Sequence, residues 1–178
     1  MRLLQILTFI LLTLPCALAA PQNPKPAFDA VLPTVTAYAL DKNKITLPAD
    51  FSAPLNLLIL SFQRDQQPVV DGWVKVMPQA GAMQTWILPI APRANGLYRW
   101  WLNSSLRGSL SPSQPRRYTV PLYVNKTQFL GALQVHSERE IALLLTDKTG
   151  HVVWRAEGPV TDSKRAALDG FVKKSAAH

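Results

Sequence analysis

The chain has 178 residues, of which 48% are hydrophobic, one is cysteine, and the formal net charge is +8 at pH 7. This length fits one ordinary domain, and the apolar content is sufficient for a buried core. The basic residues are scattered, as in the pairs Arg116-Arg117 and Lys173-Lys174, and form no stripe with interleaved aromatics. The sequence therefore argues against nucleic-acid binding, whereas weak attraction to an anionic membrane surface stays open.

Residues 1–19 have the order of a secretory signal peptide. A single charge at Arg2 precedes an apolar run over 3–14, and the small-residue stretch Ala17-Leu18-Ala19 follows. We expect cleavage near Ala19 and a periplasmic or secreted protein. An uncleaved anchor and a lipid attached to Cys16 are the alternatives, although the apolar run is shorter than the roughly 20 residues that span a bilayer. Because Cys16 is the only cysteine, the mature chain should contain no thiol.

The next segment, 20–46, is predicted to be an extended, proline-rich lead-in with some edge structure. A hairpin is expected around Asp41-Lys42-Asn43. The main domain is predicted over 47–174 and begins with a strand at 55–62. That strand is apolar at nearly every position, which is typical of a strand buried on both faces of a parallel sheet.

A helix should follow this strand, with Asp65 as its cap and Pro68 in its first turn. Its apolar face has helical spacing and comprises Val69, Val70, Trp73, Val74 and Met77. A second strand is predicted at 84–90, a helix at 93–107, and a loop rich in serine and proline at 109–115. The next strand, 117–124, contains Pro121 and is therefore expected at an edge of the sheet.

The C-terminal part is predicted to be a hairpin followed by a helix. Strands at 141–146 and 151–155 flank a turn at 147–150. Thr161 is expected to cap the last helix, with an apolar face of Ala167, Leu168, Phe171 and Val172. Alternating strands and helices of this kind predict a layered α/β domain.

Three of these stretches together resemble the thioredoxin and peroxiredoxin superfamily. They are the strand 55–62 with its helix, the strand 141–146, and the sequence Asp147-Lys148-Thr149-Gly150-His151-Val152-Val153-Trp154-Arg155. Within that superfamily the chain is most similar to the mitochondrial ATP synthase assembly-factor family and its bacterial relatives. The resemblance covers about 47–173. It implies a thioredoxin-like central mixed sheet flanked by helices, here with an N-terminal extension.

The chain also departs from this superfamily at the redox site. Redox members carry a Cys-x-x-Cys pair between the first core strand and its helix, where this chain has the sequence Arg64-Asp65-Gln66-Gln67-Pro68. The position of their cis-proline corresponds to about Ile141. This departure predicts a redox-inactive protein that neither exchanges disulfides, reduces peroxides nor binds copper through thiolates, and no cofactor is expected.

Residues Arg64, Asp65, Gln66 and Gln67 are the predicted partner-binding residues, together with Trp101. Polar groups at a helix N-terminus form a recognition surface, and tryptophan is frequent in binding hot spots. The simpler alternative is that Asp65 only caps the helix, its neighbours are solvated, and the tryptophans belong to the core. On the first interpretation the protein is not an enzyme but a protein-binding, assembly or chaperone-like factor in the cell envelope.

A different hypothesis is a metal-binding or enzymatic cleft formed by His136, Glu138 and Arg64. A zinc or iron site needs three or four converging ligands. The sequence shows no such cluster, so no metal is predicted.

Overall fold

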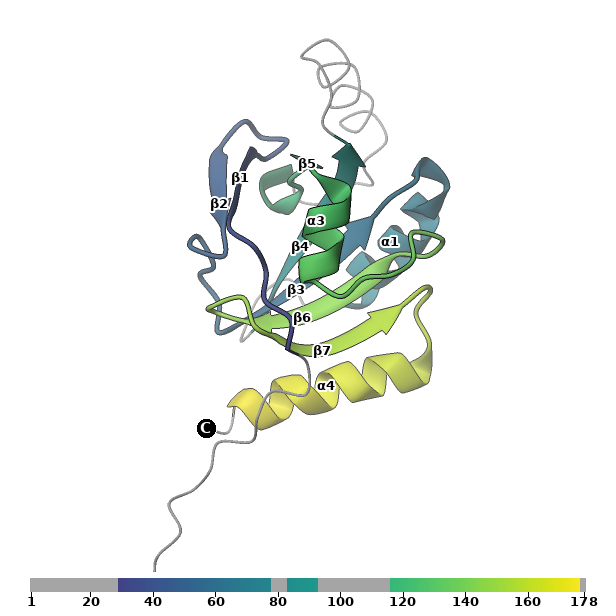
Figure 1. Ribbon diagram of the computed structural model, residues 1–178. Coiled ribbons are helices and arrows are strands. Elements are labelled where there is room, and N and C mark those ends of the chain that lie inside the picture. Colours follow the sequence, from purple (N-terminus) through teal and green to yellow (C-terminus); the bar gives the residue numbers. More distant parts are fainter. Residues whose placement is uncertain (1–28, 78–82, 93–115, 177–178) are drawn as a thin grey trace, which may run out of the picture.

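A computed structural model describes residues 29–77, 83–92 and 116–176. Its centre is a five-stranded mixed sheet in the order β5-β4-β3-β6-β7 (Figure 1). The strands are β3 (Leu55–Ser61), β4 (Met83–Pro92), β5 (Leu122–Val124), β6 (Ala142–Asp147) and β7 (Val152–Glu157). β4 runs parallel to β3 and β5, whereas β6 is antiparallel to β3 and β7. The predicted α/β class with a central mixed sheet is confirmed.

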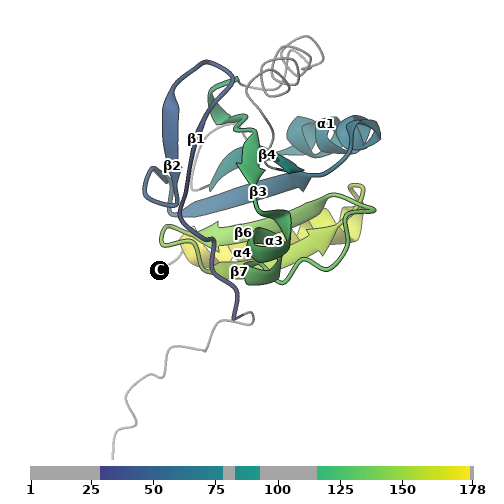
Figure 2. The ribbon, with the colours of Figure 1, turned by 45° about the horizontal axis from the view of Figure 1, so that its top comes forward.

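Helices cover both faces of this sheet (Figures 1 and 2). Helices α1 (Gln67–Val76) and α4 (Asp162–Ala176) pack on one face, and α3 (Lys126–Ala132) packs on the other. Beside α3 lies a separate antiparallel hairpin of β1 (Val35–Tyr38) and β2 (Lys44–Leu47), which confirms the hairpin predicted around Asp41-Lys42-Asn43. Two short 3₁₀ turns, η1 (Arg64–Gln66) and η2 (Arg116–Tyr118), complete the described elements.

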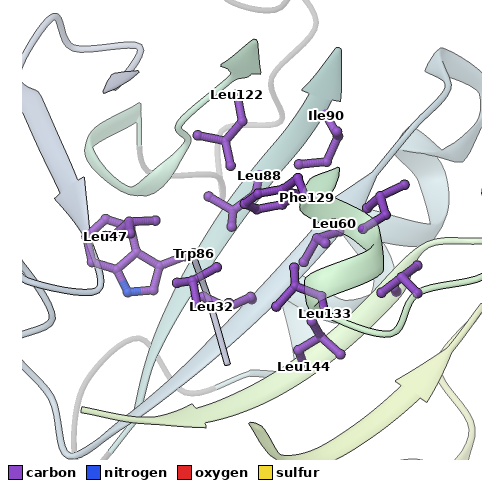
Figure 3. Packing of buried hydrophobic residues seen from close by; sticks show 14 of the residues in the cluster. Leu32, Leu47, Leu60, Trp86, Leu88, Ile90, Leu122, Phe129, Leu133 and Leu144 are labelled. Carbon is purple, nitrogen blue, oxygen red and sulfur yellow. The ribbon is translucent and has the colours of Figure 1, made fainter. Parts of the chain in front are cut away.

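The sequence of β3 explains why the sheet is buried on both sides. Alternate residues of a strand point to opposite faces. Leu58 and Leu60 belong to the cluster under α3, and Leu57 and Ile59 to the cluster under α1 and α4. All four are fully buried. Figure 3 shows the first cluster, where Phe129 of α3 and Leu133, the residue that follows α3, lie over side chains of the sheet.

The N-terminal segment is part of this core. Ala30 and Leu32 are buried, and the backbone amide of Leu32 donates to the carbonyl of Gly150 at 2.8 Å. The amide of Val152 in turn donates to the carbonyl of Ala30 at 2.9 Å. Residues 30–32 therefore extend the sheet beside the start of β7.

Several local predictions need correction. Asp65 does not cap α1, because the extra turn η1 moves the helix start and places Gln66 at the N-cap position. Pro68 does lie in the first turn of α1, as predicted. The strand expected over 117–124 is shorter, because η2 occupies its beginning; β5 is an edge strand of the sheet, as Pro121 indicated.

The last two helices also differ from expectation. No helix was predicted at α3. Asn125 is the N-cap of this helix, because its side-chain oxygen accepts from the amide of Gln128 at 3.3 Å. Thr161 caps α4 as predicted, since its hydroxyl accepts from the amide of Lys164 at 3.3 Å. Of the predicted apolar face of α4, however, Ala167 and Phe171 are exposed, because the helix meets the sheet along the narrower line of Leu168 and Val172.

The predictions at 93–107 and 109–115 lie outside the described residues, as do Trp100 and Trp101. Trp73 and Trp154 are core residues. Across residues 29–77, 83–92 and 116–176, no helix combines the length and apolar character needed to cross a bilayer.

Candidate functional site

The candidate site lies where β3 delivers the chain to α1. β3 is the central strand of the sheet and runs parallel to β4. Ligands of open α/β sheets bind beyond the carboxyl ends of such strands. The chain leaves β3 at Ser61, passes through η1 and starts α1 at Gln67. We call residues 62–66 the β3–α1 loop.

Gln66 fixes the conformation of this loop. Its side-chain oxygen accepts from the backbone amides of Phe62 at 2.7 Å and Gln63 at 3.2 Å. Its side-chain nitrogen donates to the backbone carbonyl of Glu138 at 2.9 Å. Only 6% of Gln66 is exposed. Gln66 therefore has a structural role, and its burial corrects the expectation that it forms part of an exposed contact surface.

The partner of Gln66 belongs to a second loop, residues 136–141, which leads into β6. The carbonyl of Glu138 also accepts from the side-chain amide of Gln63 at 3.3 Å. The carboxylate of Glu138 forms an ion pair with Lys126 at the start of α3. Side chains from β3–α1 and α3 therefore converge on one residue and hold the 136–141 loop in place.

A third segment, the connection from β7 to α4, contacts both α1 and the 136–141 loop. The indole nitrogen of the fully buried Trp73 donates to the carbonyl of Gly158 at 2.9 Å, and the amide of Gly158 donates to the carbonyl of Ile141 at 3.0 Å. Gly158 has a φ of +73°, which favours glycine. A Cβ at this position would lie 2.3 Å from a carboxylate oxygen of Glu140, so the two segments are in close contact.

The exposed part of the site is small and polar. Arg64 and Asp65 are exposed side by side on η1, whereas Gln67 is half-buried and donates from its side chain to Asp71 at 3.1 Å. Trp101 lies outside the described residues. Among the predicted contact residues, the structure thus presents Arg64 and Asp65 most openly.

The alternative cleft of His136, Glu138 and Arg64 is assembled only in part. The hydrogen bonds of Gln63 and Gln66 bring the two loops into contact, and His136 is exposed. The carboxylate of Glu138, however, is engaged by Lys126. The described residues contain no group of three or more His, Cys, Asp or Glu side chains arranged to hold a metal ion.

The β3–α1 loop carries hydrogen-bonding and charged side chains and no thiol. The segment 62–68 contains no cysteine, and the chain has one cysteine in total. Among the described residues, a cis peptide bond joins Leu47 and Pro48.

Comparison with solved structures defines the class of fold. BsSco, a member of the Sco family of cytochrome c oxidase assembly proteins, aligns over 86% of this chain and 96% of its own with a TM-score of 0.58 and 11% identity. The pneumococcal exposed lipoprotein thioredoxin from Streptococcus pneumoniae aligns over 80% of this chain and 99% of its own, with a TM-score of 0.51 and 13% identity. The thioredoxin domain of a thiol-disulfide oxidoreductase from Bacteroides vulgatus aligns over 83% of this chain and 99% of its own, with a TM-score of 0.50 and 18% identity.

The protein therefore has a thioredoxin-like fold. The sequence matches no model of a known protein family and no curated protein. At 11–18% identity these structures establish the fold alone.

Proposed function

We propose that this is an exported, redox-inactive thioredoxin-fold protein that binds a protein partner and acts as an assembly or chaperone-like factor in the cell envelope. Export is supported by the leader-like order of residues 1–19. The narrower resemblance to the ATP synthase assembly-factor family supports a role in assembly. BsSco, which has a similar fold, is itself a member of a family of assembly proteins.

The main observation behind the proposal is that the β3–α1 loop contains no cysteine and is held by the buried Gln66, in the stretch where the resemblance places the thiol pair of redox members. A redox site needs a reactive thiolate at the start of the helix. Here a buried side-chain amide lies just before α1 and ties the β3–α1 loop to Glu138 through a hydrogen bond of 2.9 Å. Such a bond fixes a surface without supplying a nucleophile. A surface that is already ordered loses less entropy when it binds a partner.

The chemistry of the exposed residues indicates what this surface would recognise. Arg64 and Asp65 place opposite charges next to each other on η1. Arginine favours planar, bidentate contacts with carboxylates, and it is enriched in binding hot spots. We expect the partner to present a carboxylate to Arg64 and a hydrogen-bond donor or a cation to Asp65.

The test is photocrosslinking in the native envelope, followed by a measured affinity. A photoreactive residue at position 65 should capture one protein, and a probe at the exposed Ala166 on α4 should not capture it. Purified partner should then bind the wild type more tightly than Arg64→Glu by about 10-fold or more, the range of a hot-spot residue. Neither capture nor affinity should change with a reductant or with Cys16→Ser.

Two results would overturn the proposal. One is capture from position 166 equal to that from position 65, which would show a non-specific surface. The other is catalytic turnover of a disulfide or hydroperoxide substrate by the purified protein, which would show sulfur chemistry.

A further inference from the structure

A second surface of the molecule carries a concentration of positive charge. The β1–β2 hairpin ends in a turn at 39–43, where the amide of Leu40 donates to the carbonyl of Thr119 at 2.9 Å. This bond joins the hairpin to the segment that follows η2. Lys42 and Lys44 follow Leu40 by two and four residues, and Arg116 and Arg117 precede Thr119 by three and two residues. We call these four exposed residues the basic patch.

The four cations of the basic patch are not engaged in ion pairs with the described residues. All 11 acidic residues of the chain lie in the described ranges. In those ranges none of the four cations forms a salt bridge; the ion pairs found involve Lys126, His151 and Arg165. The nearest carboxylate in sequence, Asp41, accepts instead from the backbone and side-chain amides of Asn43 at 3.0 and 2.8 Å.

An exposed aromatic ring adjoins the lysines. Tyr38 is 63% exposed and is the direct cross-strand partner of Lys44, so both side chains lie on the outer face of the hairpin. Across the Leu40–Thr119 bond, the guanidinium of Arg117 lies 5.3 Å from the ring centre of Tyr118. Tyr118 in turn packs edge-on against the buried Trp86, with ring centres 5.2 Å apart. Arg117 is therefore held on an anchored ring.

We propose that the basic patch and Tyr38 dock the protein on an anionic phospholipid bilayer. Lysine and arginine near such a surface are attracted by its negative potential, and tyrosine favours the boundary between headgroups and acyl chains. The phosphates of a bilayer are mobile, so they can pair with four cations that are spread over the surface, while the ring of Tyr38 inserts among the headgroups. Single-stranded nucleic acid would instead require several aromatic rings for base stacking along a groove. This inference is independent of the partner proposed for Arg64 and Asp65.

The experiment is co-sedimentation of the purified full-length chain with vesicles. Phosphatidylcholine vesicles with and without 30% phosphatidylglycerol separate the charge-dependent part of binding from any apolar contribution of the N-terminal segment, which is common to both. Lys42→Glu/Lys44→Glu should reduce the phosphatidylglycerol-dependent binding by at least about 10-fold, because each cation near an anionic surface contributes roughly a factor of five. Tyr38→Ser should weaken it several-fold, and binding should fall as salt is raised.

The matched control is Lys173→Glu/Lys174→Glu, which changes the net charge equally but lies on α4, away from the hairpin in Figures 1 and 2. This variant should keep most of the binding. Equal loss in both double variants would overturn the inference, because it would show attraction by net charge alone. Displacement by inorganic phosphate beyond that by chloride at equal ionic strength would also overturn it, in favour of a discrete phosphate site. Wild-type binding to phosphatidylglycerol no stronger than to phosphatidylcholine would overturn it outright.

Discussion

The turn at 147–150 and the β3–α1 loop are both held by side-chain hydrogen bonds, but over very different distances in the sequence. In the turn, one carboxylate oxygen of Asp147 accepts from the amides of Thr149 at 2.8 Å and His151 at 3.0 Å, two and four residues away. In the β3–α1 loop, Gln66 donates to the carbonyl of Glu138, which is 72 residues away. The turn is determined by its own residues, whereas the loop depends on the rest of the fold.

This difference has an energetic consequence. The acceptor oxygen in the turn belongs to Asp147, which is half-buried. If its carboxylate is lost, water can take over part of its hydrogen bonding to the turn amides. Gln66 is buried and takes part in three hydrogen bonds, so its replacement should remove more than water at the partly exposed partners can restore. We therefore expect the strongest effects of substitution at the long-range contact.

The largest effect is expected for Gln66→Met, which keeps the side-chain volume and removes all three hydrogen bonds of Gln66. The amides of Phe62 and Gln63 would be left without an acceptor. The free energy of unfolding should fall by about 2–3 kcal/mol, the loss of three hydrogen bonds that contribute about 1 kcal/mol each. Urea denaturation followed by tryptophan fluorescence measures this change.

The adjacent glutamine provides the control. Gln67→Met removes one bond between helix neighbours, from Gln67 to Asp71, on a half-buried position. It should cost less than about 0.5 kcal/mol, as for other pairs spaced i and i+4. Similar losses of unfolding free energy in the two variants would show that the hydrogen bonds of Gln66 contribute no more to stability than one bond between helix neighbours.

The next effect concerns the turn and its contact with the N-terminal segment. Gly150 has a φ of +92°, and an added Cβ would lie 3.1 Å from Pro48 Cγ and 3.2 Å from Leu32 Cβ. Gly150→Ala should therefore cost about 2 kcal/mol, from left-handed backbone and from crowding by a ring that cannot move aside. Hydrogen exchange should show faster exchange at the amide of Leu32, which donates to Gly150. Unchanged exchange there would mean that the turn and the N-terminal segment are not coupled.

The same contrast explains how much could be predicted from the sequence. The buried strand β3, the 147–150 turn and the Thr161 cap follow from local patterns, and each is found. Asn125 had the same kind of local signal, a cap followed by Phe129, Leu130 and Leu133 at helical spacing, so α3 was predictable but was missed. The role of Gln66 was not predictable, because nothing near position 66 indicates that position 138 faces it.

A smaller effect is expected at Gly158, although its added Cβ would make the closer contact, 2.3 Å from Glu140 Oε2. The obstacle here is the end of an exposed, flexible side chain, which can turn aside. Gly158→Ala should cost about 1–2 kcal/mol, mostly from the left-handed backbone. Adding Glu140→Ala should restore about 0.5 kcal/mol or more, because the two positions are in contact. Strict additivity in this double-mutant cycle would show that Glu140 does not resist the new methyl group.

The smallest effect is expected for Lys126→Met, which breaks the ion pair with Glu138. The side chains are 24% and 41% exposed, so the pair should contribute about 0.5–1 kcal/mol and less in 1 M salt. Arg165→Met is the control, because its pair with Asp169 is more exposed, at 52% and 49%, and should contribute less. Thermal unfolding at low and high salt measures both. If the losses in unfolding free energy of Lys126→Met and Gln66→Met are additive, the backbone of the 136–141 loop alone positions the Glu138 carbonyl for Gln66. If the double variant loses less than the sum of the two, the ion pair helps to position that carbonyl.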